Sequence, residues 1–252
     1  MKINYIKFNI LFLLVMLVFA CKRDDIKSEN VPMGKVMVFN GVVGSGSLKV
    51  SVSPHDKYWS SISDNMSLYN KGSMVFIAPV GGNIVKATQL TDTTKMLYRS
   101  KIEVQENSFY SLYLTGTSTD IDTLFRKEEN IPKVPPIDVR KKLTAQDSII
   151  YIRFTNLSYN GPKVNINIRN SINREVNNLG YKESTDFKTY SASSNAPIVF
   201  EVRSAVDNSL LMTYGFNAMY FRFRTVEVVI AGSINPDVSF SDRYGVEVIP
   251  LL

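Results

Sequence analysis

The sequence repeats its own pattern at one fixed offset, and this repeat limits the fold more than any other feature. Asn40 and Asn156, 116 residues apart, each follow a run of β-forming residues. The same shift places Leu48, Val50 and Val52 on Val164, Ile166 and Ile168, Leu90 on Val206, Asp92 on Asn208, Tyr98 on Tyr214, and 112–116 on 228–232. A shift that holds from residue 40 to residue 116 indicates two copies of one domain.

Each copy has the residue pattern of a β-domain. Short alternating runs rich in Val, Ile, Tyr, Phe and Thr are separated by Gly, Asn, Asp and Pro, which is typical of all-β chains. The fold class we predict is all-β, with two tandem immunoglobulin-like antiparallel β-sandwich domains. Strands are expected near 35–43, 47–53, 74–79, 83–90, 96–105, 109–115 and 121–126, and again near 149–157, 163–169, 187–191, 197–204, 209–214, 219–231 and 238–249.

The N-terminus has the parts of a secretory signal peptide. Lys2 and Lys7 accompany a largely apolar stretch, 8–19, which is shorter than the roughly 20 residues that span a bilayer. Ala20 then precedes Cys21. This segment resembles the lipobox of bacterial lipoproteins, which implies cleavage before Cys21, diacylglycerol on its thiol and an acyl chain such as palmitate on its amine. Because Cys21 is the only cysteine, intramolecular disulfides are excluded.

An acidic pair follows the predicted lipidation site. Asp24 and Asp25 lie close behind Cys21, and such a pair is similar to the surface-export signal of Bacteroidota lipoproteins. The alternative is a solvated linker without a signal. We therefore expect a protein that is lipid-anchored in the outer membrane and exposed on the cell surface, with the periplasmic face as the alternative location.

These features divide the chain into five parts. Pro132, Pro135 and Pro136 mark the joint between the two copies, because proline cannot donate a hydrogen bond to a central strand ladder. The predicted parts are a lipoprotein signal peptide (1–20), a flexible tether (21–34), β-sandwich domain 1 (35–129), a Pro-containing linker (130–147) and β-sandwich domain 2 (148–252).

The charge balance argues against a nucleic-acid partner. Removing residues 1–20 takes two of the 29 basic side chains and leaves 27 against 23 acidic ones, a net charge near +4. These charges are dispersed along the chain, whereas nucleic-acid binding needs a concentrated basic patch. The partners we expect are the membrane, through the N-terminal lipid, and an envelope protein or a glycan. The oligomeric state is left open.

The sequence does not mark an active site. His55 is the only histidine, and its neighbours Ser53 and Asp56 have the spacing of a turn rather than of a preorganised triad. Zinc would need a cluster of Cys, His and carboxylates, and no calcium loop is recognisable. We therefore predict no enzyme activity, no metal and no cofactor, and an enzyme with an unmarked carboxylate pair is a minor alternative.

Two aromatic features of the sequence have different interpretations. Tyr58 and Trp59 lie in a polar loop and are the candidate ligand-binding residues, since exposed aromatic rings can stack on a sugar or anchor a protein. The alternative is that Trp59 closes one end of the first core. The run Phe221–Arg224 alternates aromatic and cationic residues, which predicts a half-buried strand or a charged edge strand.

Two segments of the second copy carry a family resemblance. The runs 152–158 (IRFTNLS) and 226–232 (VEVVIAG) resemble the bacterial family called domain of unknown function 4397, whose members occur in tandem in Bacteroidota lipoproteins. The first copy departs more, since Asn40 is followed by Gly41 and Val42. The resemblance implies a sandwich fold and an envelope location, and it implies no activity or functional residues.

The function we expect from the sequence is that of a non-catalytic, lipid-anchored cell-envelope protein. It would act as a binding or spacer module with protein or glycan partners. The alternative is a carbohydrate-capturing accessory lipoprotein of an outer-membrane nutrient-uptake complex.

Overall fold

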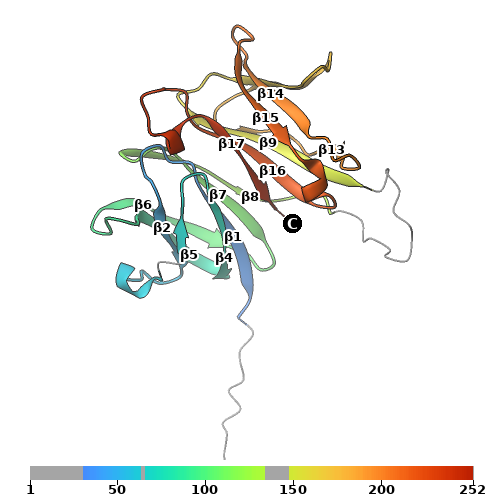
Figure 1. The fold of residues 1–252 in the computed structure, drawn as a ribbon. Helices are drawn as coiled ribbons and strands as arrows, with labels where there is room; N and C mark the ends of the chain where they lie inside the picture. The colour runs from blue at the N-terminus through green and yellow to red at the C-terminus, as the bar shows by residue number, and fades with distance from the viewer. Residues whose placement is uncertain (1–30, 64–65, 134–147, 252) are drawn as a thin grey trace, which may run out of the picture. The chain divides into compact units, whose positions relative to one another are not determined.

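The computed structural model describes residues 31–63, 66–133 and 148–251, and it confirms the all-β prediction with several β-sheets (Figure 1). The first copy contains β1 (Met33–Asn40), β2 (Leu48–Ser53), the 3-10 helix η1 (Trp59–Ser61), β3 (Ser67–Leu68), β4 (Ser73–Pro79), β5 (Gly81–Gln89), β6 (Met96–Val104), β7 (Phe109–Thr117) and β8 (Asp120–Lys127). The second copy contains β9 (Ile149–Tyr159), β10 (Val164–Ile168), β11 (Arg174–Leu179), β12 (Glu183–Ser184), β13 (Lys188–Ser191), β14 (Ile198–Ser204), β15 (Leu210–Phe216), η3 (Ala218–Phe221), β16 (Thr225–Ser233), η4 (Phe240–Asp242) and β17 (Gly245–Pro250).

The described strands form two sheets in each copy. In the first copy, an outer sheet has the strand order β3-β2-β5-β6 and an inner sheet has the order β4-β1-β7-β8. In the second copy, the outer sheet is β11-β10-β14-β15 and the inner sheet is β12-β9-β16-β17, with β13 also paired to β9. Two facing sheets in each copy agree with the predicted β-sandwiches, and the immunoglobulin-like assignment stays a prediction.

Each inner sheet contains one parallel strand pair, and the two pairs have equivalent registers. β1 runs parallel to β7 with Lys35 opposite Phe109, and β9 runs parallel to β16 with Tyr151 opposite Thr225. Tyr151 and Thr225 each lie 116 positions after their counterparts. The repeat seen in the sequence is therefore also a repeat of strand pairing.

Three buried apolar clusters hold the sheets together. One lies between the outer and inner sheets of the first copy, and another lies between those of the second copy. The third lies between the two inner sheets and consists of Met37, Phe39, Tyr113, Leu157, Val229, Ala231, Ile249 and Leu251. We call it the shared layer. Since residues from Pro32 onward belong to one compact unit, the two sandwiches are joined by an apolar core and not only by the chain.

The inner strands have the sequence expected of strands buried on both faces. Every residue of β16 is buried, and so are the central residues of β7. A strand covered on both faces loses its alternation and becomes a nearly continuous apolar run, as in 110–114 and 226–231. Burial stabilises by roughly 25 cal/mol per Å² of apolar surface, so the shared layer favours close docking of the inner sheets.

The predicted strand 219–231 is wrong in its first part. Residues Ala218–Phe221 form η3, where the Asn217 side chain accepts a hydrogen bond from the Met219 amide at 3.2 Å. Such a side-chain cap competes with strand formation. β16 begins only at Thr225.

The alternation in Phe221–Arg224 does not produce a strand. Phe223 has a φ of 61°, which lies far from the extended region. Phe221 stacks on Phe216 at 5.5 Å between ring centroids. The two phenylalanines are partly buried and the two arginines are exposed, as the sequence suggested, but they lie in a turn and not in a strand.

Other boundaries also differ from the sequence prediction. The predicted strand 238–249 is divided between η4 and β17. β3, β11 and β12 were not expected, and two of them contain only two residues. Short edge strands carry too few residues for a recognisable pattern.

The predicted linker is described only at its start. Ile131 packs against the shared layer, and the Thr225 hydroxyl donates a hydrogen bond to the Pro132 carbonyl at 2.6 Å. Residues 134–147 lie outside the described part of the chain. Among the described residues, no helix is long and apolar enough to cross a bilayer.

Candidate functional site

A cluster of buried charged side chains lies between the two copies. Glu227 on β16 is fully buried and accepts hydrogen bonds from Arg126 and Arg153, each at 2.7 Å. The Tyr113 hydroxyl donates to the same carboxylate at 2.5 Å, and the Thr155 hydroxyl also donates to it. Since Tyr113 and Arg126 belong to the first copy, this carboxylate is bound from both sandwiches.

A second carboxylate completes the cluster. Glu128, just after β8, accepts from the two terminal nitrogens of Arg153 at 2.8 and 2.9 Å and from Arg126 Nε at 2.8 Å. The guanidinium–carboxylate pair of Arg153 and Glu128 is bidentate, a geometry that is both strong and directional. With two cations and two anions, these four side chains are formally neutral.

The environment keeps Glu128 and Arg153 charged and Tyr113 neutral at neutral pH. Burial acts to raise the pKa of Glu128, but the hydrogen bonds and charge of Arg153 outweigh it and lower that pKa to about 2. Burial opposes the charge of Arg153, yet Glu128 and Glu227 raise its pKa. Burial and then the charge of Glu227 raise the pKa of Tyr113. A group whose pKa lies far from 7 is poorly suited to proton transfer at neutral pH. The cluster therefore has the character of a structural contact.

Further polar contacts join the two copies. Lys182 forms an ion pair with Asp122 at 2.8 Å, and Lys71 donates a hydrogen bond to the Arg243 carbonyl at 2.5 Å. Together with the buried cluster, these directional contacts fix one relative position of the inner sheets, whereas apolar packing alone is less directional.

Sequence reasoning missed this cluster, although one signal was present. Glu227 interrupts the apolar run 226–231, and Arg153 lies between Ile152 and Phe154 in another apolar strand. A charged residue in a strand buried on both faces requires a buried partner. Glu227 and Arg153 pair with each other, and their further partners, Arg126 and Glu128, come from the other copy, which the sequence does not show.

The predicted aromatic residues lie together at η1 in the first copy. Tyr58 is 84% exposed, and Trp59 is partly buried. The Lys86 ammonium lies 4.6 Å from the centre of the Trp59 ring, which is a cation–π distance. One face of the Trp59 ring is therefore occupied by Lys86, and Tyr58 offers the more accessible ring.

A small ion-pair group supports this loop. Asp56 pairs with Lys86 at 2.9 Å and with Arg99 at 3.2 Å. These two cations are cross-strand neighbours in β5 and β6, and their like charges would repel without Asp56. Hydrogen bonds from Lys86 and then Arg99 lower the pKa of Asp56. The group positions the loop that carries Tyr58 and Trp59.

The other sequence candidates do not assemble into a reactive site. His55 is exposed, and its amide donates to the Ser53 hydroxyl at 3.3 Å, which is a local turn contact. In the described parts of the chain, no group of His, Cys, Asp and Glu is placed to hold a metal ion. Cys21, the predicted lipidation site, lies outside the described residues.

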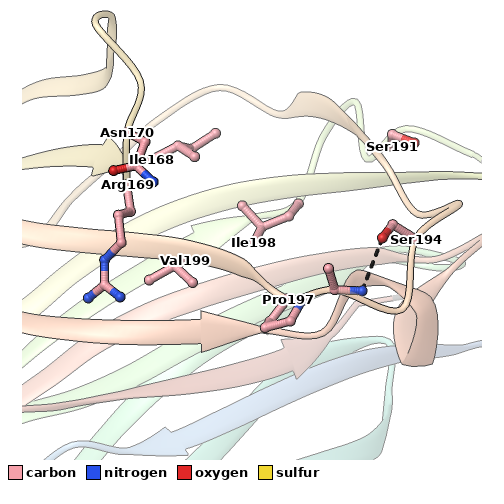
Figure 2. Close-up of a pocket in the computed structure, with 9 residues that line it drawn as sticks. Ile168, Arg169, Asn170, Ser191, Ser194, Pro197, Ile198 and Val199 are labelled. Carbon is pink, nitrogen blue, oxygen red and sulfur yellow. Dashed lines mark hydrogen bonds between the residues drawn. The ribbon is translucent and has the colours of Figure 1, made fainter.

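A shallow hollow of about 470 Å³ lies in the second copy (Figure 2). Ser191 and Ser194 lie on one side of it, and Arg169 lies on the other. The Ser194 hydroxyl accepts from the Ala196 amide at 3.0 Å, and Arg169 is paired with Glu201 at 3.4 Å. Both lining groups therefore form local contacts within the second copy.

No protein-family model and no curated protein matches the sequence. Among solved structures, the N-terminal domain of AlgF from P. aeruginosa is similar at 20% identity, over 39% of this chain and 98% of that one, with a TM-score of 0.27. A proposed adhesin from Bacteroides ovatus is similar at 10% identity, over 88% of this chain and 94% of that one, with a TM-score of 0.17. Both TM-scores are low, so neither similarity carries an argument. The resemblance to domain of unknown function 4397 stays a prediction from the sequence.

Proposed function

We propose that this chain is a non-catalytic, lipid-anchored protein of the bacterial envelope whose two sandwiches act as one rigid binding or spacer module. The observation that carries the proposal is the contact between the inner sheets. Glu227 and Arg153 of the second copy are bonded to Arg126 and Glu128 of the first. A joint of this kind keeps a fixed geometry, which a spacer or a two-domain binding surface requires.

The chemistry of the buried charges supports a mechanical role. Glu128 and Glu227 are both within ion-pair distance of arginines and are buried away from solvent. Breaking a buried ion pair is costly because an uncompensated charge remains. These residues therefore stabilise one arrangement of the two sandwiches.

The proposed location is the outer membrane, with the module facing the cell surface. It depends on the lipobox-like segment that ends at Cys21 and on the acidic pair Asp24 and Asp25. Two or more acyl chains give a stable anchor, whereas one gives only marginal binding. The proposed partners are an envelope protein or a glycan.

Two variants test the anchor and the export signal separately. Cys21→Ser should move the protein from the membrane fraction to the soluble fraction. The double variant Asp24→Asn and Asp25→Asn should remain in the membrane fraction and become resistant to protease added to intact cells. Continued detergent-dependent association of Cys21→Ser would refute lipid anchoring, and unchanged protease digestion of the double variant would refute the export signal.

A second candidate function is direct carbohydrate capture, and the exposed Tyr58 favours it. Aromatic rings at glycan sites stack on sugar faces, and the ion-pair group around Asp56 holds this loop in place. Glycan binding should fall on Tyr58→Ala and on Trp59→Ala. The matched control is Tyr220→Ala, because Tyr220 is also highly exposed but lies in the second copy. Binding that responds equally to all three changes would argue against this site.

A further inference from the structure

β4 is an edge strand of the first inner sheet with an apolar exposed side. Among the described strands it pairs with β1 alone, and its sequence, SMVFIAP, has no charged side chain. Val75 is 49% exposed and Ile77 is 69% exposed. Natural sheet edges are usually blunted by charges, bulges or very short strands. β4 has seven residues and an apolar exposed side.

Val75 and Ile77 also direct their backbone groups away from β1. The Asn40 amide bonds to the Gly72 carbonyl, and the Val80 amide bonds to the Pro32 carbonyl, both at 2.9 Å. These bonds place the even-numbered residues of β4 in the hydrogen-bonded pairs with β1, since such pairs alternate along an antiparallel ladder. Val75 and Ile77 therefore direct their N–H and C=O groups toward the open edge.

The exposed strip continues the contact between the two sandwiches. A hollow of about 530 Å³ beside β4 is lined by Met33, Val75, Ile77, Phe109 and Leu251, among others. Leu251 belongs to the shared layer, and Phe109 packs against it. The hollow therefore connects the shared layer to the side chains of the β4 edge, with the exposed Lys35 between Ile77 and Phe109.

The second copy does not have this surface at the equivalent place. Ile77 of β4 pairs with Lys35, and Thr189 of β13 pairs with Tyr151. Since Tyr151 lies 116 residues after Lys35, Thr189 occupies the position equivalent to Ile77. The exposed apolar residue of the first copy is thus replaced by threonine, and β13 also carries Lys188. An open apolar edge is not a requirement of the fold, because only one of the two copies has it.

We propose that β4 pairs in antiparallel fashion with β4 of a second copy of this chain, joining the two first inner sheets into one continuous sheet. A register centred on Phe76 places Val75 opposite Ile77 of the second copy. Both residues have outward backbone groups, so each such pair can exchange its two hydrogen bonds. The apolar side chains of Val75 and Ile77 then cover one another across the two-fold axis.

The ends of β4 are compatible with this register. Ser73 falls opposite Pro79 of the second copy, where the missing proline N–H removes one bond but leaves the carbonyl as an acceptor for the Ser73 amide. Lys71 falls opposite Gly81, so the register brings no like charges together. The edge is therefore complementary to itself, and this favours a second copy over an unrelated strand.

Sedimentation of the purified full chain in detergent tests the proposal. The wild-type protein should have the mass of a dimer at concentrations of about 10–100 μM. Ile77→Lys, which places two ammonium groups at the new junction, should raise the dimer dissociation constant at least about tenfold. Thr189→Lys is the matched control and should leave the mass unchanged. Both positions are exposed, and unchanged thermal unfolding will show that the variants remain folded.

Cross-linking tests the register. Chains carrying Val75→Cys, mixed with chains carrying Ile77→Cys, should form a disulfide-linked dimer more readily than either variant alone. A wild-type chain that stays monomeric overturns the proposal. This holds even if β4 then binds a strand of another protein. So does a dimer that persists in Ile77→Lys, or one that Thr189→Lys weakens equally.

Discussion

Arg153 of the second sandwich binds both carboxylate oxygens of Glu128 of the first sandwich, at 2.8 and 2.9 Å. The Glu128 side chain is almost completely buried. A bidentate pair in this position connects the two copies through a contact whose geometry has little freedom. The stability of the joint should therefore depend on the charge of Glu128.

The first prediction concerns pH. The pKa of Glu128 falls from an ordinary 4.5 to about 2 in the folded protein, so its charged form contributes stability above pH 4.5. That contribution is lost as the pH falls from about 4.5 to about 2, and it amounts to about 3 kcal/mol. Urea unfolding measures the free energy of unfolding of the wild type and of Glu128→Gln. The difference between the two values should become smaller as the pH falls from about 4.5 to about 2. A difference that is the same at pH 7 and pH 2.5 would contradict the assignment.

The second prediction concerns the fully buried carboxylate. Glu227→Ala leaves Arg126 and Arg153 without one of their anions and should lower the free energy of unfolding by about 3–5 kcal/mol. The control is Glu201→Ala, because Glu201 pairs with Arg203 nearer the surface and a solvent-screened pair should contribute much less to stability. Denaturant titration measures both values. Similar small losses in the two variants would show that the buried cluster does not stabilise the joint.

The third prediction concerns cooperativity. Because the shared layer is buried between both copies, the two sandwiches should unfold in one transition. The unfolding transition followed by Trp59 fluorescence reports on the first copy. It should have the same midpoint as the transition followed by far-UV circular dichroism, which reports on both copies. Val229→Asp places a charge in the shared layer and should separate the two signals, whereas Val206→Asp, at an exposed position, should not. Separate transitions in the wild type would mean that the sandwiches are independent.

The duplication and its turn chemistry were predictable from the sequence. Asn40 Nδ2 donates to the Leu68 carbonyl at 3.3 Å, and Asn156 Nδ2 donates to the Leu179 carbonyl at 3.0 Å. Each Asn Oδ1 also accepts from the amide two residues later. Matching asparagines at one offset therefore marked matching structures, because a buried Asn needs specific partners.

The contact between the copies could not be predicted in the same way. Glu227 and Arg126 are 101 residues apart, and no local pattern encodes a pairing over that distance. The run 226–231 indicated burial but not what covers the second face. The edge position of β4 was also hidden, since Val75 and Ile77 have the same alternation in an edge strand as in a central one.

The fourth prediction concerns two glycines related by the repeat. Gly116 has a φ of 81° and Gly232 has a φ of 93°; a Cβ on either would lie 2.4 Å from a backbone oxygen, that of Asp120 or Arg243. Both the left-handed conformation and this close approach exclude a side chain. Gly116→Ala and Gly232→Ala should each lower the free energy of unfolding by more than about 2 kcal/mol. Gly215→Ala is the control, because its nearest atom would be 3.8 Å away, and it should change stability by less than about 1 kcal/mol. Equal effects at all three positions would contradict a shared backbone requirement in the two copies.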